Sequence, residues 1–176
     1  MQFELRHTFN APVDQVIQAM FDPALADHLK AHMKLIREIR PLERNESGGQ
    51  VRRRIRYVPV PIIESVGPKK ISPETLAWVE ESTFDQAQKR ISFKNIADHE
   101  KVRKHLENSG TITFREIAPG KTERTVAGEL KVGNLPFLLK PLASIAERII
   151  YSNAQDILNE EARAFGSFLT ERQKTA

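Results

Sequence analysis

The chain contains no cysteine among its 176 residues, and it has only one tryptophan and two tyrosines. The lack of cysteine excludes disulfides, a thiol nucleophile and cysteine-ligated metal. No apolar run approaches the ~20 residues of a transmembrane helix, and the start MQFELRHTFN has no secretory-signal pattern. Catalytic signatures such as a Gly-x-Ser-x-Gly elbow, a P-loop or a dinucleotide-binding motif are also missing. We therefore expect a cytoplasmic protein without a cofactor.

The composition predicts one folded domain over residues 1–176, since 40% of the residues are hydrophobic and 28% are charged. The net charge of +4 is uneven, because residues 30–56 hold nine Lys or Arg against three Glu. Such a segment attracts nucleic acid, anionic lipid or an acidic ligand. The aromatic residues and motifs of nucleic-acid binders are absent, so we do not expect a nucleic-acid partner.

The hydrophobic pattern predicts an α+β fold with a long final helix. A strand over 2–10 is followed by two short helices, the second ending near His32. Alternating residues and turn signals then predict antiparallel strands over 34–44, 50–58, 75–84, 89–97, 109–117 and 122–132, with an irregular segment at 59–73. Apolar residues at helical spacing predict a helix over 136–172. The sheet should curve around this helix to bury one face.

This order of elements resembles the helix-grip fold of the START-like superfamily, also called SRPBCC or Bet v 1-like. The opening FELRHTFNAPVDQVIQAMFDP is similar to the usual N-terminus of that superfamily, and the resemblance covers nearly the whole chain. Within it, the chain resembles the bacterial DUF2505 group, and ISFKNIADHEKV and ASIAERIIYSNAQ are similar to segments of PRELI-type phospholipid carriers. The superfamily includes carriers, cyclases, hydrolases and chaperone activators, so the resemblance implies a fold and several functions.

The segment RRRIRY at 52–57 places one arginine on an apolar face of its predicted strand. Arg52, Arg54 and Arg56 share one side, whereas Arg53 shares the other with Ile55 and Tyr57. An inward guanidinium needs an anion. Either Glu80 on a later strand forms an internal ion pair with Arg53, or Arg53 binds the carboxylate or phosphate of a ligand.

A sparse set of polar side chains in an apolar cavity is typical of a small-molecule site. We predict such a cavity between the sheet and the long helix. Its predicted lining residues are His7, Arg53, Tyr57, Trp78, Phe93, Asn95, Leu142, Ile145, Ile149 and Asn153. Each polar member could instead be a satisfied core residue.

Two proline-rich apolar segments are expected at the mouth of this cavity. They contain Ile62 and Ile63 in the first and Phe137 and Leu138 in the second, and each is followed by lysine. This combination suits a gate that makes transient contact with an anionic membrane, although the same residues could simply cover the end of the core.

His28 and His32 have a spacing that can place two imidazoles on one metal ion. No motif supplies a third ligand, so a surface pair is the expectation and no metal site is predicted.

Three functions remain open. A noncatalytic carrier or sensor of a lipid or fatty-acid-like molecule with an anionic head is favoured, because no spacing links catalytic residues. The second is a cyclase or hydrolase with His7 as acid and base. The third is a protein-interaction module with a filled core.

Overall fold

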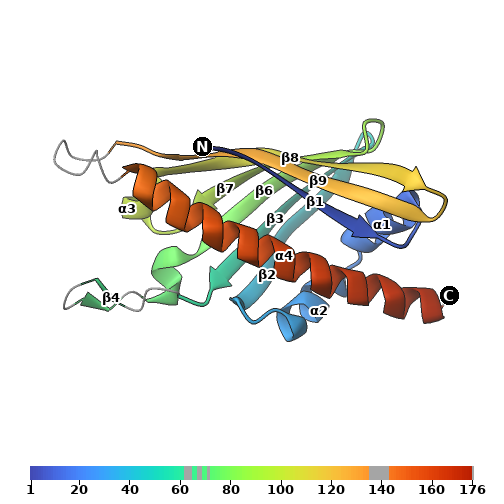
Figure 1. Ribbon diagram of the computed structural model, residues 1–176, viewed down its shortest axis with the longest axis horizontal. Coiled ribbons are helices and arrows are strands. Elements are labelled where there is room, and N and C mark those ends of the chain that lie inside the picture. Colours follow the sequence, from blue (N-terminus) through green and yellow to red (C-terminus); the bar gives the residue numbers. More distant parts are fainter. Residues whose placement is uncertain (62–64, 67–68, 71, 135–142, 176) are drawn as a thin grey trace.

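The computed structural model describes residues 1–61, 65–66, 69–70, 72–134 and 143–175. A seven-stranded antiparallel sheet has the order β1-β9-β8-β7-β6-β3-β2. The long helix α4 runs along the concave side of this sheet, and the short helices α1 and α2 lie near its C-terminal half (Figure 1). This arrangement is the helix-grip fold, as the sequence predicted.

The boundaries follow the alternation and turn signals closely. The strands of the large sheet are β1 (Gln2–Phe9), β2 (Ile36–Ser47), β3 (Gln50–Pro59), β6 (Trp78–Asp85), β7 (Arg90–Ala97), β8 (Leu106–Ala118) and β9 (Lys121–Val132). A separate hairpin is formed by β4 (Ser65–Val66) and β5 (Lys69–Lys70). The helices are α1 (Val13–Met20), α2 (Leu25–His32), α3 (Glu100–Arg103), α4 (Ala143–Thr175) and the 3-10 turn η1 (Pro73–Leu76).

Two segments differ from the prediction. The strand expected from residue 75 begins at Trp78, because Pro73–Leu76 form the 3-10 turn η1. The charged segment after β7 contains the short helix α3, whose arginine Arg103 donates to the Ala97 carbonyl at 2.8 Å. Residues 136–142, predicted as the start of the long helix, lie outside the described part. No helix in the described part is both long and apolar enough to span a bilayer.

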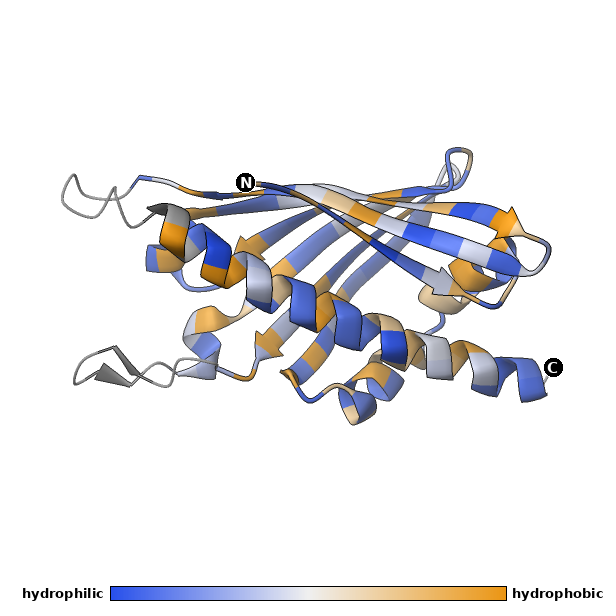
Figure 2. Cartoon of the chain, in the orientation of Figure 1, coloured by the Kyte–Doolittle hydropathy of each residue, from blue (hydrophilic) through white to orange (hydrophobic). Residues whose placement is uncertain are grey.

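Local sequence explains the elements. Pro12 immediately precedes α1, where a fixed φ suits a helix start. The β2–β3 turn contains Gly48 and Gly49 with φ of 58° and 75°, values that glycine adopts without strain. Hydrophilic and hydrophobic residues alternate along the strands (Figure 2), as a sheet with one solvent-facing side requires.

The core is filled at the C-terminal half of α4. Phe165 of this helix packs edge-on against Phe9 with ring centroids 5.0 Å apart. Around them, Val16 of α1, Ile91 of β7 and Val126 of β9 are fully buried. This end of the interior therefore has the dense packing of an ordinary protein core.

The interior beside the N-terminal half of α4 is packed less completely. Six apolar side chains of the concave face are only partly buried there, although Leu130 of β9 is 1% exposed: Phe3, Leu5, Ile55, Tyr57, Trp78 and Phe93. Tyr151 of α4 reaches the sheet here, with its ring 6.1 Å from that of Phe3. The fold thus joins a closed core to a partly accessible interior.

Candidate ligand-binding site

The strand register places three polar side chains side by side in the partly accessible interior. Glu80 of β6 pairs across the ladder with Asn95 of β7, and Asn95 pairs with Asn108 of β8. The Asn95 amide donates to the Asn108 side-chain carbonyl at 3.3 Å. These residues form a polar row across the concave face, with Phe93 and Trp78 on the same face.

Arg53 points to the concave side and joins this row. Its side chain is 14% exposed, and that of Glu80 is 17% exposed. The guanidinium Nε donates to Ser82 Oγ at 3.1 Å and Nη1 donates to the Met20 carbonyl at 3.0 Å, while the face of the Phe21 ring lies 4.8 Å away. Arg53 Nη2 lies 3.8 Å from Glu80 Oε1, so the internal ion pair is present, although at that distance it is not a hydrogen bond.

Two acceptor atoms of the polar row lack hydrogen-bond partners within the described part of the chain. Glu80 Oε1 and Asn95 Oδ1 are both buried, and neither accepts a hydrogen bond from the described residues. A buried acceptor without a donor costs about 1–3 kcal/mol. The row therefore offers acceptors that a donor from a bound molecule would satisfy.

An aromatic pair borders the polar row. The rings of Tyr57 and Trp78 stack with centroids 5.3 Å apart and an interplanar angle of 15°. Burial, and secondarily the negative charge of Glu80, raises the pKa of the Tyr57 phenol. Its hydroxyl therefore remains protonated at neutral pH and is a potential hydrogen-bond donor.

His7 belongs to a second polar cluster, closer to the filled core. Arg124 of β9 is 1% exposed and donates to both carboxylate oxygens of Glu161 on α4, at 2.9 and 2.5 Å. It also donates to His7 Nδ1 at 3.3 Å. His7 Nε2 then carries the proton and donates to Asn159 Oδ1 at 3.1 Å.

Burial and the neighbouring charge of Arg124 lower the pKa of His7. Both ring nitrogens already have protein partners, so neither points to an unpaired position. This arrangement fits a structural histidine better than a general acid or base, which needs a nitrogen within reach of the reacting group.

The start of α4 presents a different face to the sheet from the one expected. Ile145 and Ile149 are 54% and 45% exposed, whereas Glu147 accepts a hydrogen bond from the Val132 N–H at 3.0 Å and Tyr151 contacts Phe3. Positions 145 and 149 lie two residues from these contacts, on the opposite side of a helix. The stripe predicted through Ile145 and Ile149 is thus rotated away from the sheet.

Of the remaining predicted site residues, the structure describes only Asn153. Asn153 is partly buried, while Leu142 and the predicted gate residues Ile62, Ile63, Phe137 and Leu138 lie outside the described residues. A ligand-binding role for any of these side chains stays a prediction.

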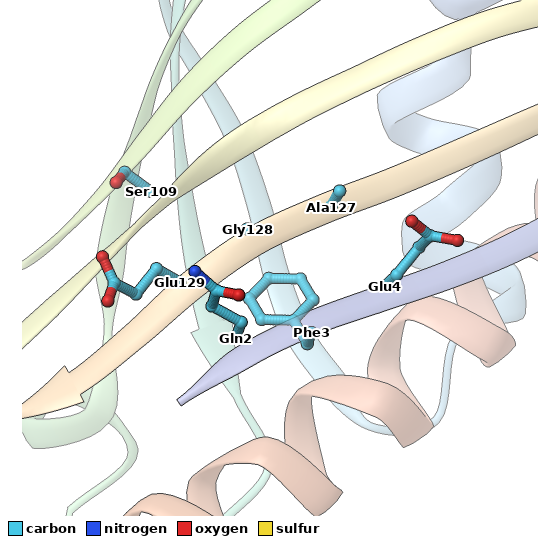
Figure 3. A pocket seen from close by; sticks show the side chains of 7 residues that line it. All are labelled: Gln2, Phe3, Glu4, Ser109, Ala127, Gly128 and Glu129. Atoms are coloured by element: carbon cyan, nitrogen blue, oxygen red, sulfur yellow. The ribbon is translucent and has the colours of Figure 1, made fainter.

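Two pockets differ in their surroundings. A pocket of about 10 Å³ lies between β1, β8, β9 and α4, lined by Phe3, Leu5, Asn108, Leu130, Tyr151, Ala154, Gln155 and Leu158. That is about the space one water molecule needs. A wider, open depression of about 620 Å³ is lined by Gln2, Phe3, Glu4, Ser109, Ala127, Gly128 and Glu129 (Figure 3).

The wider depression lacks the apolar walls typical of a small-molecule site. Most of its residues alternate with those that face α4, so it lies on the outer side of the sheet. Its carboxylates are engaged nearby, Glu4 with Arg6 at 2.7 Å and Glu129 with Lys131 at 3.0 Å. The concave side remains the candidate site.

The outward arginines of β3 meet acidic side chains of neighbouring strands. Arg54 lies 3.1 Å from Glu81, and Arg56 lies 2.6 Å from Asp98 and 3.4 Å from Glu38. The basic segment is therefore partly neutralised within the protein.

Sequence reasoning missed Arg124, Glu161 and Asn108. The signal for Arg124 was available, because it shares its strand parity with Val126 and Leu130, as Arg53 does with Ile55. Asn108 lies just before the predicted start of its strand, so its orientation could not be derived.

Comparison with known proteins supports the fold. No family model matches the chain, and no curated protein matches it. Among solved structures, the Zhui aromatase/cyclase from Streptomyces sp. R1128 superimposes with a TM-score of 0.68 at 14% identity, covering 98% of this chain and 94% of that one. A norcoclaurine synthase point mutant from Thalictrum flavum gives 0.66 at 14% identity, with 98% and 96% covered. The protein TTHA0849 from Thermus thermophilus gives 0.63 at 17% identity, with 94% and 97% covered.

These similarities support the helix-grip fold. At such identities they carry no residue roles across to this chain.

Proposed function

We propose that the protein binds a hydrophobic small molecule, lipid or fatty-acid-like, between the sheet and the N-terminal half of α4. The observation that carries the proposal is the contrast between the two ends of the interior. Fully buried side chains fill the end at Phe165, whereas Trp78 and Phe93 remain partly accessible. A noncatalytic carrier or sensor needs such an apolar interior with a few polar groups.

Glu80 limits which ligand head group can bind beside Arg53. The sequence favoured an anionic head, because Arg53 faces inward. With Glu80 Oε1 only 3.8 Å from Arg53, an anion bound by Arg53 would also meet a carboxylate. A head group with a hydroxyl could accept from Arg53 and donate its one proton to either Glu80 Oε1 or Asn95 Oδ1.

Ligand binding can be measured by the fluorescence of Trp78, which is the single tryptophan of the chain and stacks on Tyr57. The purified chain would be titrated with a long-chain fatty acid and with the fatty alcohol of the same length. Native mass spectrometry with lipid extraction would identify any copurifying molecule. If neither ligand binds and no lipid copurifies, the interaction-module alternative replaces the carrier.

Substitution of Arg53 tests the head-group contact. Arg53→Leu should weaken binding by roughly 2–4 kcal/mol, the scale for removing one partner of a desolvated charged hydrogen bond. Arg53→Lys should recover part of the loss, because it keeps the charge but not the planar fork. The outward Arg52→Leu is the matched control and should cost less than about 1 kcal/mol. Equal effects at both positions would indicate a diffuse electrostatic surface instead.

Glu80→Gln then separates the two head groups. An anionic head should bind more tightly once the carboxylate is neutralised, whereas a hydroxyl head should bind no better, because it loses a charged acceptor. Each variant must first be shown to fold, since Arg53 and Glu80 also contact one another.

An enzyme that uses the same cavity is the second candidate, and it is favoured by the structural similarity to an aromatase/cyclase and a norcoclaurine synthase. His7→Gln should then abolish turnover while leaving ligand affinity largely intact. The engagement of both His7 nitrogens argues against this role.

The sequence resemblance to narrower families is consistent with the proposed function. Similarity to the DUF2505 group and to PRELI-type carriers, a cytoplasmic location and transient contact with anionic membranes all agree with a lipid carrier. Binding of the chain to anionic but not neutral vesicles would support the membrane contact.

A further inference from the structure

His28 and His32 of α2 meet a third possible ligand from the far end of the chain. Glu171, in the last turns of α4, brings a carboxylate oxygen 3.6 Å from His28 Nδ1. One donor atom from each of the three side chains lies within 4.8 Å of the others. The spacing along α2 supplies two imidazoles, and the packing of α4 against α2 adds the carboxylate.

Hydrogen bonds fix which nitrogen of each ring is available. His28 Nε2 lies 3.1 Å from the Ala164 carbonyl and 2.9 Å from Ser167 Oγ. Because a carbonyl oxygen can only accept, Nε2 carries the proton and Nδ1 keeps the lone pair. His32 Nδ1 lies 2.8 Å from the His28 carbonyl, so the lone pair of His32 is on Nε2.

This is the pattern seen at metal-binding histidines, whose other N–H usually donates to a carbonyl or carboxylate that orients the ring. The two nitrogens with lone pairs belong to residues that the cluster brings together with Glu171. We propose that His28 Nδ1, His32 Nε2 and a Glu171 carboxylate oxygen bind a divalent transition-metal ion, with Zn²⁺ as the first candidate.

The donor set determines the class of ion. Two imidazoles and one carboxylate suit Zn²⁺, Co²⁺, Ni²⁺ or Cu²⁺, whereas Mg²⁺ and Ca²⁺ prefer oxygen ligands throughout. Three protein ligands leave a fourth tetrahedral position for water. Both His32 and Glu171 are exposed, so that position is open to solvent.

Binding requires a small adjustment of side chains. Ligand atoms about 2.0–2.1 Å from Zn²⁺ lie roughly 3.3–3.4 Å apart in a tetrahedron, closer than the 4.8 Å limit of the present cluster. The two imidazoles stack with centroids 4.0 Å apart and planes at 20°, and an ion must lie near both ring planes. His28 is held by its two contacts, so the exposed His32 ring has to rotate toward the ion and gives up its 2.8 Å contact with the His28 carbonyl.

The backbone around Glu171 is already anchored. The neighbouring Arg172 forms an ion pair with Asp22, which lies between α1 and α2, and the Gln173 amide donates to the Asn10 carbonyl at 3.1 Å. The ion would thus join two helices whose relative position is set, which lowers the ordering cost of binding.

The test uses the full-length chain without an affinity tag. Isothermal titration with ZnCl₂ should give one site in the wild type. His32→Ala and Glu171→Gln should each lower the affinity roughly tenfold or more, because loss of a ligand should cost at least as much as loss of its orienting partner, about 10–100-fold. His99→Ala is the control, since His99 is exposed and its side chain does not cap α3, and it should bind like the wild type.

A second measurement separates this site from accidental surface binding. A hundredfold excess of Zn²⁺ over its dissociation constant should raise the wild-type Tm by about 5–10 °C, and His32→Ala should lose most of that shift. Co²⁺ should give the absorption of a four-coordinate ion in the wild type only. Absence of Zn²⁺ binding in the wild type, or binding by His32→Ala and Glu171→Gln as tight as that of the wild type, would overturn the proposal.

Discussion

The ion pair between Arg124 and Glu161 joins β9 to α4, and Glu161→Gln should weaken the fold sharply. Arg124 is 1% exposed and its Nε has no hydrogen-bond partner in the described part. Glu161 supplies the compensating charge through two hydrogen bonds. Loss of one partner of a buried pair costs about 3–5 kcal/mol. Because glutamine keeps one acceptor, we expect a loss of about 2–3 kcal/mol in the free energy of unfolding.

Urea denaturation followed by circular dichroism measures this loss. With an m-value of about 2 kcal/mol/M, the midpoint should fall by about 1–1.5 M while the slope stays unchanged. Glu123→Gln is the matched control, because Glu123 pairs with the 71% exposed Arg115 at 2.9 Å. Glu123 is 18% exposed, as Glu161 is, but its partner arginine lies in solvent, and such a screened pair contributes less than about 1 kcal/mol. If Glu161→Gln costs no more than Glu123→Gln, the buried charge is not what holds α4 here.

The double variant Arg124→Met with Glu161→Met removes both charges of the buried pair. Replacing a buried ion pair by apolar residues of similar volume is often neutral or stabilising. The double variant should therefore be more stable than Glu161→Gln alone. A double variant that is less stable than Glu161→Gln would show that the hydrogen bonds, rather than the stranded charge, supply the stability.

Two further predictions concern stability. The lowered pKa of His7 means that, as pH falls, the unfolded chain binds a proton before the folded chain does. The stability that neutral His7 contributes is therefore present above the unfolded pKa of about 6.5 and is lost as pH falls through the lower folded pKa. Urea midpoints at pH 7.5 and pH 5 should differ more in the wild type than in His7→Gln, and equal differences would contradict the assignment. Gly128→Ala should destabilise by more than about 1 kcal/mol, since its Cβ would lie 2.5 Å from the Ser109 carbonyl oxygen and 2.8 Å from the Phe3 ring. Gly133→Ala meets no described residue within 4 Å and should leave the thermal midpoint nearly unchanged.

Much of the fold could be predicted because each strand carries its own period of two. That period placed His7 and Arg53 on the concave side without any knowledge of their neighbours. The same parity would have found Arg124. Alternation fixes a face, however, and not the partners across it, so the contact between Arg124 and Glu161 required the actual packing of α4.

The helix was harder to orient than the strands. Its contacts with the sheet include Glu147, Tyr151 and Glu161, while Ile145 and Ile149 are exposed. A pattern that counts apolar residues alone therefore selects the wrong side of the first turns. The contact between Glu171 and His28 could not be predicted from local sequence patterns, because tertiary packing brings these two residues together.

The strand order has a consequence for how the protein is made. Among the described strands, β1 pairs only with β9, in a register that joins Gln2 to Glu129. During synthesis the N-terminal segment leaves the ribosome long before its partner strand exists, and its apolar residues Phe3, Leu5 and Phe9 stay uncovered until then. Contacts so distant in sequence slow folding and prolong exposure to aggregation. The nascent chain thus depends on its last third to complete the sheet, and a ribosome that stalls before β9 is finished would leave β1 without a place to dock.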